Sequence, residues 1–169
     1  MNYQQNRTFG DKFMREVSGI LGQALIMPAP KEEDCERNTD LMVLGMDSVR
    51  IGCRIRKNRY IQRYGYEFTI RGRSRNNMKT EISKIIEGWG DYLFYGFASP
   101  CESHLERWTI ISLNEFRIWH SREMFRLKHM PGQFQENGDG SALYGFDLRM
   151  MPRQIVFADN WLYQNQQVA

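Results

Sequence analysis

The sequence predicts an α/β (α+β) fold, a single domain in which helices flank a central mixed β-sheet. Two patterns lead to this prediction. Some segments alternate apolar and polar residues with the period of a strand, and others repeat apolar residues every three or four positions, as one face of a helix does. The 169 residues, 41% of them hydrophobic and 13% aromatic, are enough to bury one core.

A helix is predicted near the N-terminus. Residues 1–10 are polar, and we expect them to be flexible. Between Asp11 and Leu25, apolar residues recur at spacings of three and four, which predicts an amphipathic helix that ends before Pro28. The acidic residues 31–40 are compatible with a short helix or with a loop.

Three strands are predicted next. Residues 41–44 are a short apolar run, whereas residues 49–56 and 66–71 alternate apolar side chains with arginine, threonine and glutamate. In both alternating strands the polar face is expected to point outward. Because residues 58–65 between them are polar, the two strands are predicted to pair as an antiparallel hairpin with a long tip.

The remainder alternates helices and strands. Thr80 and Gly88 are expected to begin and end a helix over residues 81–87, and the apolar run 92–98 predicts a central strand. Further predictions are a strand at 108–113, a helix from Asn114, and closing strands at 144–148 and 154–157. Residues 99–169 are predicted as a C-terminal αβ extension, which is compatible with a longer sheet, a homodimer contact or a cover over a substrate.

Positive charge is concentrated between Arg50 and Lys79. This stretch has ten basic residues and one acid, Glu67, a net charge of +9 in a chain whose net charge is +3. Basic residues interleaved with tyrosines suit phosphate neutralisation and contacts with bases. We therefore expect nucleic acid, DNA more than RNA, to bind Arg54, Arg56, Arg59, Arg63, Arg71, Arg73, Arg75 and Lys79. The alternatives are an acidic protein partner and ion pairs with the acids of residues 31–40.

The order helix, three strands, helix, strand over residues 11–98 resembles the αβββαβ core of the PD-(D/E)XK (restriction-endonuclease-like) nuclease superfamily. The chain is also similar to phage or prophage accessory proteins. The first resemblance implies a DNA nuclease that uses Mg²⁺ or Mn²⁺. Members carry an acid on the first helix, an Asp that leads one strand, and an acid-x-Lys triplet on the next. The carboxylates hold the metal ions, and the lysine polarises the attacking water or the phosphate.

The resemblance implies a set of site residues in this chain. The metal ligands would be Glu16, Asp40, Asp47 and Glu67, and the catalytic residues would be Asp40, Glu67 and Lys84. The triplet departs from the family pattern, because Glu67-Phe68-Thr69 has threonine in place of lysine and Arg54-Ile55-Arg56 has no acid. Lys79 or Lys84 could replace the missing lysine.

Each of these residues also has a structural interpretation. Glu67 could instead pair with Arg54, Arg56 or Arg71 across the predicted hairpin, and Asp40 could cap a turn. Glu81 is expected to compensate the dipole of its helix. Two alternative functions follow: a catalytically inactive nuclease-like protein that binds DNA or RNA, and a phage-encoded inhibitor of a host defence complex.

Other classes are disfavoured. An odd number of cysteines without paired spacing, together with the lack of a signal peptide or an apolar span, predicts a cytoplasmic protein that does not use a membrane. Cys101-x-x-His104, with His120 and His129 further on, lacks the second ligand pair of a zinc site. No Walker, Rossmann or nucleophile-elbow motif occurs.

Overall fold

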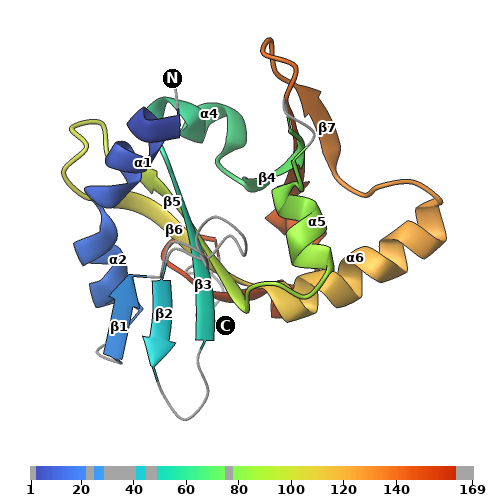
Figure 1. The fold of residues 1–169 in the computed structure, drawn as a ribbon, viewed down its shortest axis with the longest axis horizontal. Helices are drawn as coiled ribbons and strands as arrows, with labels where there is room; N and C mark the ends of the chain where they lie inside the picture. The colour runs from blue at the N-terminus through green and yellow to red at the C-terminus, as the bar shows by residue number, and fades with distance from the viewer. Residues whose placement is uncertain (1–2, 22–24, 29–40, 45–48, 75–77, 163–169) are drawn as a thin grey trace, which may run out of the picture.

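In the part of the chain that the computed structural model describes (residues 3–21, 25–28, 41–44, 49–74 and 78–162), six strands form a mixed sheet (Figure 1). Their order across the sheet is β1-β2-β3-β5-β6-β9. The strands are β1 Leu25–Pro28, β2 Leu41–Leu44, β3 Val49–Arg56, β5 Tyr92–Ala98, β6 Leu105–Ser112 and β9 Val156–Asp159. Strands β3 and β5 are parallel and the other neighbours are antiparallel, so the predicted mixed α/β fold is confirmed.

A second, antiparallel sheet has the strand order β4-β8-β7. Its strands are β4 Glu67–Arg73, β8 Ala142–Asp147 and β7 Gln133–Glu136. Strand β4 pairs with β8, with Phe68 opposite Phe146, and β7 pairs with the other edge of β8. This leaves β4 as an outer strand of the three-stranded sheet.

The helices are α1 Tyr3–Asp11, α2 Met14–Ile20, α4 Ile61–Tyr64, α5 Glu81–Ile86 and α6 Leu113–Leu127, with short 3-10 helices η1 Asn58–Tyr60, η2 Leu148–Met150 and η3 Arg153–Ile155. Helices α1 and α2 cover one face of the six-stranded sheet (Figure 1). Helices α5 and α6 and the three-stranded sheet cover the other. None of the helices among the described residues is long and apolar enough to cross a membrane.

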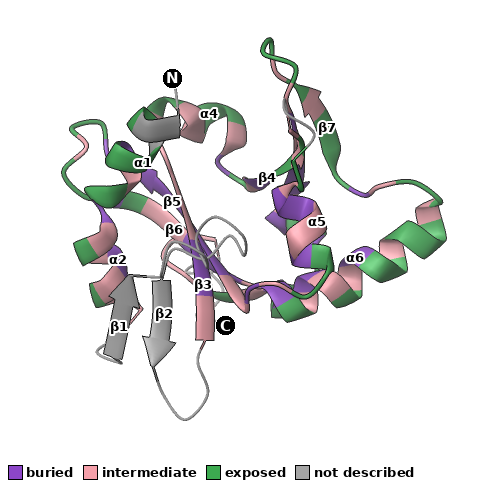
Figure 2. Cartoon of the chain, in the orientation of Figure 1, coloured by how far each residue is buried: buried purple, intermediate pink, exposed green. Residues whose placement is uncertain are grey.

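Strand β5 contributes to both hydrophobic clusters. Phe94 and Ala98 pack against Phe13 and Val17 on the α1–α2 side, and the alternate residue Leu93 packs on the opposite side. Figure 2 shows that β5 is buried along almost its whole length. The prediction of a central strand at residues 92–98 is confirmed, because a strand buried on both faces is apolar at nearly every position.

The predicted hairpin of residues 49–56 and 66–71 is wrong. Strand β3 pairs with β2 and β5, and β4 belongs to the other sheet. Residues 58–64, which were expected at the hairpin tip, form η1 and α4 and carry the chain from one sheet to the other. Period-two alternation identifies a strand but does not identify its partner, and both edges of β3 are already occupied.

The N-terminal prediction also needs correction. The expected flexible segment forms α1, in which Phe9 is buried and contacts Phe13 with a ring-centroid distance of 5.4 Å. The expected single helix ends at Ile20, and Leu25 begins β1. A meander of β1, β2 and β3 therefore precedes α5 and β5 in the six-stranded sheet. Among the described residues four strands, and not the predicted three, lie between α2 and α5, with β1, β2 and β3 in the six-stranded sheet and β4 in the other.

The predicted boundaries of α5 are confirmed. The Thr80 side chain accepts a hydrogen bond from the Ser83 N–H, which is an N-cap. At the other end Gly88 has a φ of +97°, and the N–H groups of Gly88 and Trp89 donate to the carbonyls of Ile85 and Lys84 at 3.0 and 3.1 Å. Thr80 and Gly88 thus define both ends of α5.

The C-terminal third extends both sheets. Strands β6 and β9 lengthen the six-stranded sheet beyond β5, and β7 and β8 build the sheet that β4 joins. The strands predicted at 144–148 and 154–157 correspond to β8 and β9, which lie in different sheets. Of the three roles compatible with the sequence, extension of the sheet is the one that the structure shows.

Candidate functional site

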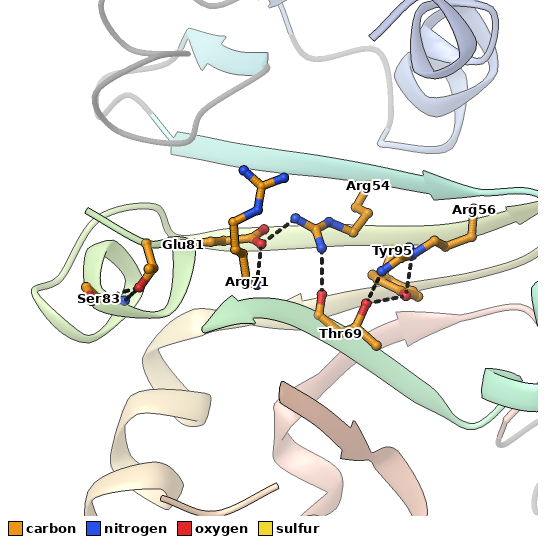
Figure 3. Close-up of polar contacts among 8 residues, drawn as sticks. Arg54, Arg56, Thr69, Arg71, Glu81, Ser83 and Tyr95 are labelled. Atoms are coloured by element: carbon orange, nitrogen blue, oxygen red, sulfur yellow. Dashed lines mark hydrogen bonds and ion pairs between the residues drawn. The ribbon is translucent and has the colours of Figure 1, made fainter. Parts of the chain in front are cut away.

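The arginines of β3 face the three-stranded sheet. Ile51, Cys53 and Ile55 pack on the side of α1 and α2, so alternation turns Arg54 and Arg56 toward the opposite side. There they meet β4 and α5 (Figure 3). The expectation of an outward arginine face is therefore wrong for these two residues, because the second sheet packs on that side.

Arg54 is held by an ion pair. Its guanidinium donates to the Glu81 carboxylate, and the Arg54 and Glu81 side chains are 22% and 6% exposed. Arg54 Nη1 also donates to the Thr69 carbonyl at 3.1 Å. The Glu81 carboxylate accepts the backbone N–H of Arg71 at 2.9 Å. Figure 3 shows these contacts joining β3, β4 and α5.

Arg56 is held by neutral partners. Its Nε donates to the Tyr95 hydroxyl at 3.1 Å, and its Nη2 donates to the Thr69 hydroxyl (Figure 3). The two hydroxyl groups are themselves 3.1 Å apart, and both residues are buried. Arg56 makes no ion pair with the described carboxylates, so two neutral hydroxyl groups fix its guanidinium in position.

Two more arginines project from the connection between the sheets. Arg59 of η1 and Arg63 of α4 are exposed, and their guanidinium carbons lie 5.0 and 5.1 Å from the ring centroids of Tyr60 and Tyr64. Arg56 approaches the Tyr60 ring as well, at 5.8 Å. The tyrosine rings thus connect Arg56 with Arg59 and Arg63, and stacking on aromatic rings restricts how these guanidinium groups move.

Arg71 completes the group. It is exposed on β4, and its side chain makes no ion pair with the residues that the structure describes. Figure 3 shows its guanidinium group on the same side of β4 as that of Arg54. We refer to Arg54, Arg56, Arg59, Arg63 and Arg71 as the arginine row.

The other residues expected to bind nucleic acid are engaged elsewhere or are not described. Arg73 donates to Glu136 at 2.6 Å and lies over the Phe134 ring. Lys79 forms an ion pair with Glu87. Arg75 lies outside the described residues. Carboxylates thus compensate the charges of Arg73 and Lys79. Arg56, Arg59 and Arg71, in contrast, have no carboxylate partner among the described residues.

Half of the expected metal ligands can be placed. Glu16 of α2 accepts the N–H of Leu105 with both carboxylate oxygens, at 3.0 and 2.9 Å. Glu67 begins β4, on the opposite side of the six-stranded sheet. The structure therefore does not bring Glu16 and Glu67 together. Asp40 and Asp47 lie outside the described residues.

Of the three expected catalytic residues, Asp40 lies outside the described residues, and Glu67 and Lys84 lie on different elements, β4 and α5. Helix α5, which carries Lys84, reaches β4 where Glu81 binds Arg71, about 13 Å along an extended strand from Glu67. Within the described ranges no three His, Cys, Asp or Glu side chains could share a metal ion.

Glu67 is not paired with the arginines that the hairpin would have placed beside it. Its charged neighbours are Asp147, Arg149 and Arg63. Burial and the neighbouring Asp147 raise the pKa of the Glu67 carboxyl, and Arg149 and Arg63 oppose this effect. Arg149 is itself bound to Asp147 at 2.6 Å.

The cysteine and histidines considered for zinc do not form a site. His120 is buried in α6, where desolvation lowers its pKa, and its Nε2 lies 3.0 Å from the sulfur of Met130. Cys101 and His104 lie in the exposed turn between β5 and β6, on either side of Ser103. Neither Cys53 nor Cys101 forms a disulfide within the part of the chain that the structure describes.

Sequence reasoning missed the side chains that hold the arginine row. Thr69 and Tyr95 were assigned to strands without a role, and Glu81 was expected to compensate a helix dipole. Glu81 is nearly fully buried, which is rare for an unpaired carboxylate. A useful signal was its position at the start of a helix, directly before Ile82 and one turn before Ile85, because a carboxylate beside buried isoleucines needs a partner.

Comparisons with known proteins add no relative: the chain matches no family model, no curated protein and no solved structure. The resemblance to PD-(D/E)XK nucleases therefore stays a prediction from the sequence pattern.

Proposed function

We propose that the protein binds nucleic acid through the arginine row. The observation that carries this proposal is the pre-positioning of four arginines on β3, η1 and α4 by buried hydrogen bonds and tyrosine rings, beside the exposed Arg71 of β4. Guanidinium groups bind phosphate with paired N–H donors, and a fixed guanidinium loses little side-chain entropy on binding. Arg56, Arg59 and Arg71 have no carboxylate partner among the described residues, so no described acid compensates their charge.

A binding function is better supported than a nuclease function. The nuclease implied by the resemblance needs clustered carboxylates and a nearby lysine. Glu67 stands apart from Glu16 and Lys84, whereas the arginine row is continuous. We propose a DNA-binding protein of the cytoplasm, with RNA as the second nucleic acid to be tested.

The experiment is electrophoretic retardation of labelled DNA and RNA over a series of salt concentrations. Logarithmic affinity is expected to fall linearly with logarithmic salt concentration, and a variant that binds one phosphate fewer should reduce the slope for duplex DNA by about 0.9. Arg59→Ala and Arg71→Ala are the test variants. Arg122→Ala is the matched control, because Arg122 is exposed on α6 away from the row.

Weaker binding and a smaller slope in both test variants, with Arg122→Ala unchanged, would support the proposal. A flat salt dependence, or equal effects of all three substitutions, would contradict it. Binding to an acidic host protein in preference to every nucleic acid would assign the arginine row to the inhibitor function instead.

A further inference from the structure

A hollow of about 280 Å³ lies beside the arginine row, between α4 and the three-stranded sheet. Arg63 and Tyr64 line it from α4, Glu67 from β4, Phe134 and Gln135 from β7, and Gly145 from β8. This volume is at the small end of ligand sites and suits one planar ring with a short polar extension. Arg63 belongs both to this hollow and to the arginine row.

Glu67 brings an unused acceptor into the hollow. Its carboxylate accepts no hydrogen bond from the residues that the structure describes, although it is half-buried. Gly145 makes room for it, since a Cβ atom at that position would lie 2.7 Å from Glu67 Oε2. A carboxylate removed from water in this way favours a ligand that supplies N–H donors.

The other walls add a ring and an amide. Phe134 is 50% exposed; its ring packs against Tyr144 at a centroid distance of 5.2 Å, with the Arg73 guanidinium 5.7 Å from its own centroid, and it offers an aromatic surface. The Tyr64 hydroxyl donates to Gln135 Oε1 at 2.8 Å. This bond orients the Gln135 amide and leaves its nitrogen as a donor. A ring surface, a carboxylate, an amide and an arginine are the groups that recognise an unstacked nucleotide.

We infer that the hollow binds one unstacked nucleobase of a single-stranded nucleic acid, preferentially guanine, with Glu67 accepting hydrogen bonds from its Watson–Crick edge and Arg63 contacting its phosphate. This inference rests on the proposed nucleic-acid-binding function. Guanine presents two adjacent N–H donors, at N1 and N2, which match the two oxygens of a carboxylate. Adenine and cytosine have a ring nitrogen acceptor beside their amino group, and uracil has a carbonyl on each side of its N–H. In each of these bases a lone pair would therefore lie next to an oxygen of the Glu67 carboxylate and be repelled by it.

The test is titration of the protein with the mononucleotides GMP, AMP, CMP and UMP, in which NMR spectra of the protein report binding at each step. The expected result is binding of GMP about tenfold tighter than the others, the discrimination of one bidentate contact. Free arginine, which also offers paired N–H donors, is titrated alongside.

Two variants address Glu67 directly. Glu67→Gln keeps the shape of the side chain and should remove the preference for GMP. Gly145→Ala should do the same by displacing the carboxylate. Gly138→Ala is the matched control, since Gly138 lies in the turn of the same sheet with open space around its Cβ position and should keep the preference.

The outcomes separate the two proposals. Equal binding of all four mononucleotides, an unchanged preference in Glu67→Gln, or arginine binding in preference to GMP would overturn the inference about the hollow. Retardation of duplex DNA that depends on Arg59 and Arg71 would then leave the proposed function standing. Failure to bind any oligonucleotide or mononucleotide would overturn both.

Discussion

Arg54 and Glu81 form an ion pair that closes the outer edge of β4. An edge strand exposes unpaired backbone groups on the side away from its neighbour. On β4 the Thr69 carbonyl accepts from Arg54 at 3.1 Å, and the Arg71 N–H donates to Glu81 at 2.9 Å. Both backbone groups point away from β8, so the ion pair stands where another strand would otherwise pair. It also fixes one end of the arginine row.

The substitution Glu81→Ala should therefore destabilise the fold. It leaves Arg54 without its counter-ion and the Arg71 N–H without its acceptor. Removing one partner of a buried ion pair lowers the free energy of unfolding by about 3 kcal/mol. Urea denaturation followed by circular dichroism measures this decrease.

Glu87→Ala provides the matched control at the end of the same helix. Glu87 pairs with Lys79, but these side chains are 44% and 49% exposed. Exposed pairs contribute less than about 1 kcal/mol. Equal decreases in Glu81→Ala and Glu87→Ala would show that the Arg54–Glu81 pair does not hold β4.

Local features of the fold could be predicted from the sequence, because short-range physics determines them. Thr80 caps α5 through a hydrogen bond to a residue three positions away, and Gly88 ends the helix by adopting a conformation that glycine favours. The uniformly apolar β5 could be placed at the centre of a sheet for a similar reason, since its composition reflects burial on both faces.

Partners distant in the chain could not be predicted. Strand β4 alternates as a hairpin strand would, but Phe68 pairs with Phe146 on β8. Phe9 lies in a polar segment and is buried only because the sheet lies beneath α1. The same holds for the candidate site. Its basic residues could be predicted from charge alone, whereas the contact of Arg54 with Glu81 depends on how the two sheets pack.

Glu67 should make the stability of the protein depend on pH. Burial and Asp147 raise its pKa in the folded state, so the folded chain holds this proton to a higher pH than the unfolded chain. The contribution of Glu67 to the free energy of unfolding is fully present below the pKa that glutamate has in the unfolded chain. It is lost as pH rises through the raised pKa that Glu67 has in the folded chain. In Glu67→Gln that decrease should be absent, and thermal unfolding over a pH series measures it. An identical pH profile in the variant would contradict the assigned burial of the carboxylate.

Cys101 should react as a thiolate near neutral pH. Hydrogen bonds from the Ser103 and Ser99 hydroxyls lower its pKa to about 7, and the residue is exposed. Alkylation with iodoacetamide should therefore increase with pH to a half-maximal rate near pH 7, as located by mass spectrometry. Ser103→Ala should move the midpoint upward, toward the ordinary cysteine value of about 8.5. Cys53, which is partly buried on β3, serves as the internal comparison. A midpoint unaffected by Ser103→Ala would exclude the serine as its cause.

Divalent metal ions should leave bound DNA intact. The reason is geometric: Glu16 and Glu67, the two expected metal ligands that the structure describes, lie on opposite sides of the six-stranded sheet. Labelled duplex DNA incubated with the protein and Mg²⁺ or Mn²⁺ should therefore remain full-length, as it does with EDTA at matched ionic strength. Glu67→Ala should bind duplex DNA, whose bases are stacked and paired, as well as or better than the unsubstituted protein, since removing an acid beside Arg63 lessens the repulsion of phosphate.

Cutting that requires the metal and is abolished in both Asp40→Ala and Glu67→Ala would reverse this conclusion. It would mean that Asp40 completes a metal site with Glu67, as the resemblance to PD-(D/E)XK nucleases implies. Glu87→Ala separates chemistry from charge, because it removes one negative charge from a carboxylate that already pairs with Lys79. Cutting abolished in all three variants would show that the loss is not specific to the expected metal ligands, and cutting retained only in Glu87→Ala would identify the carboxylates that hold the metal.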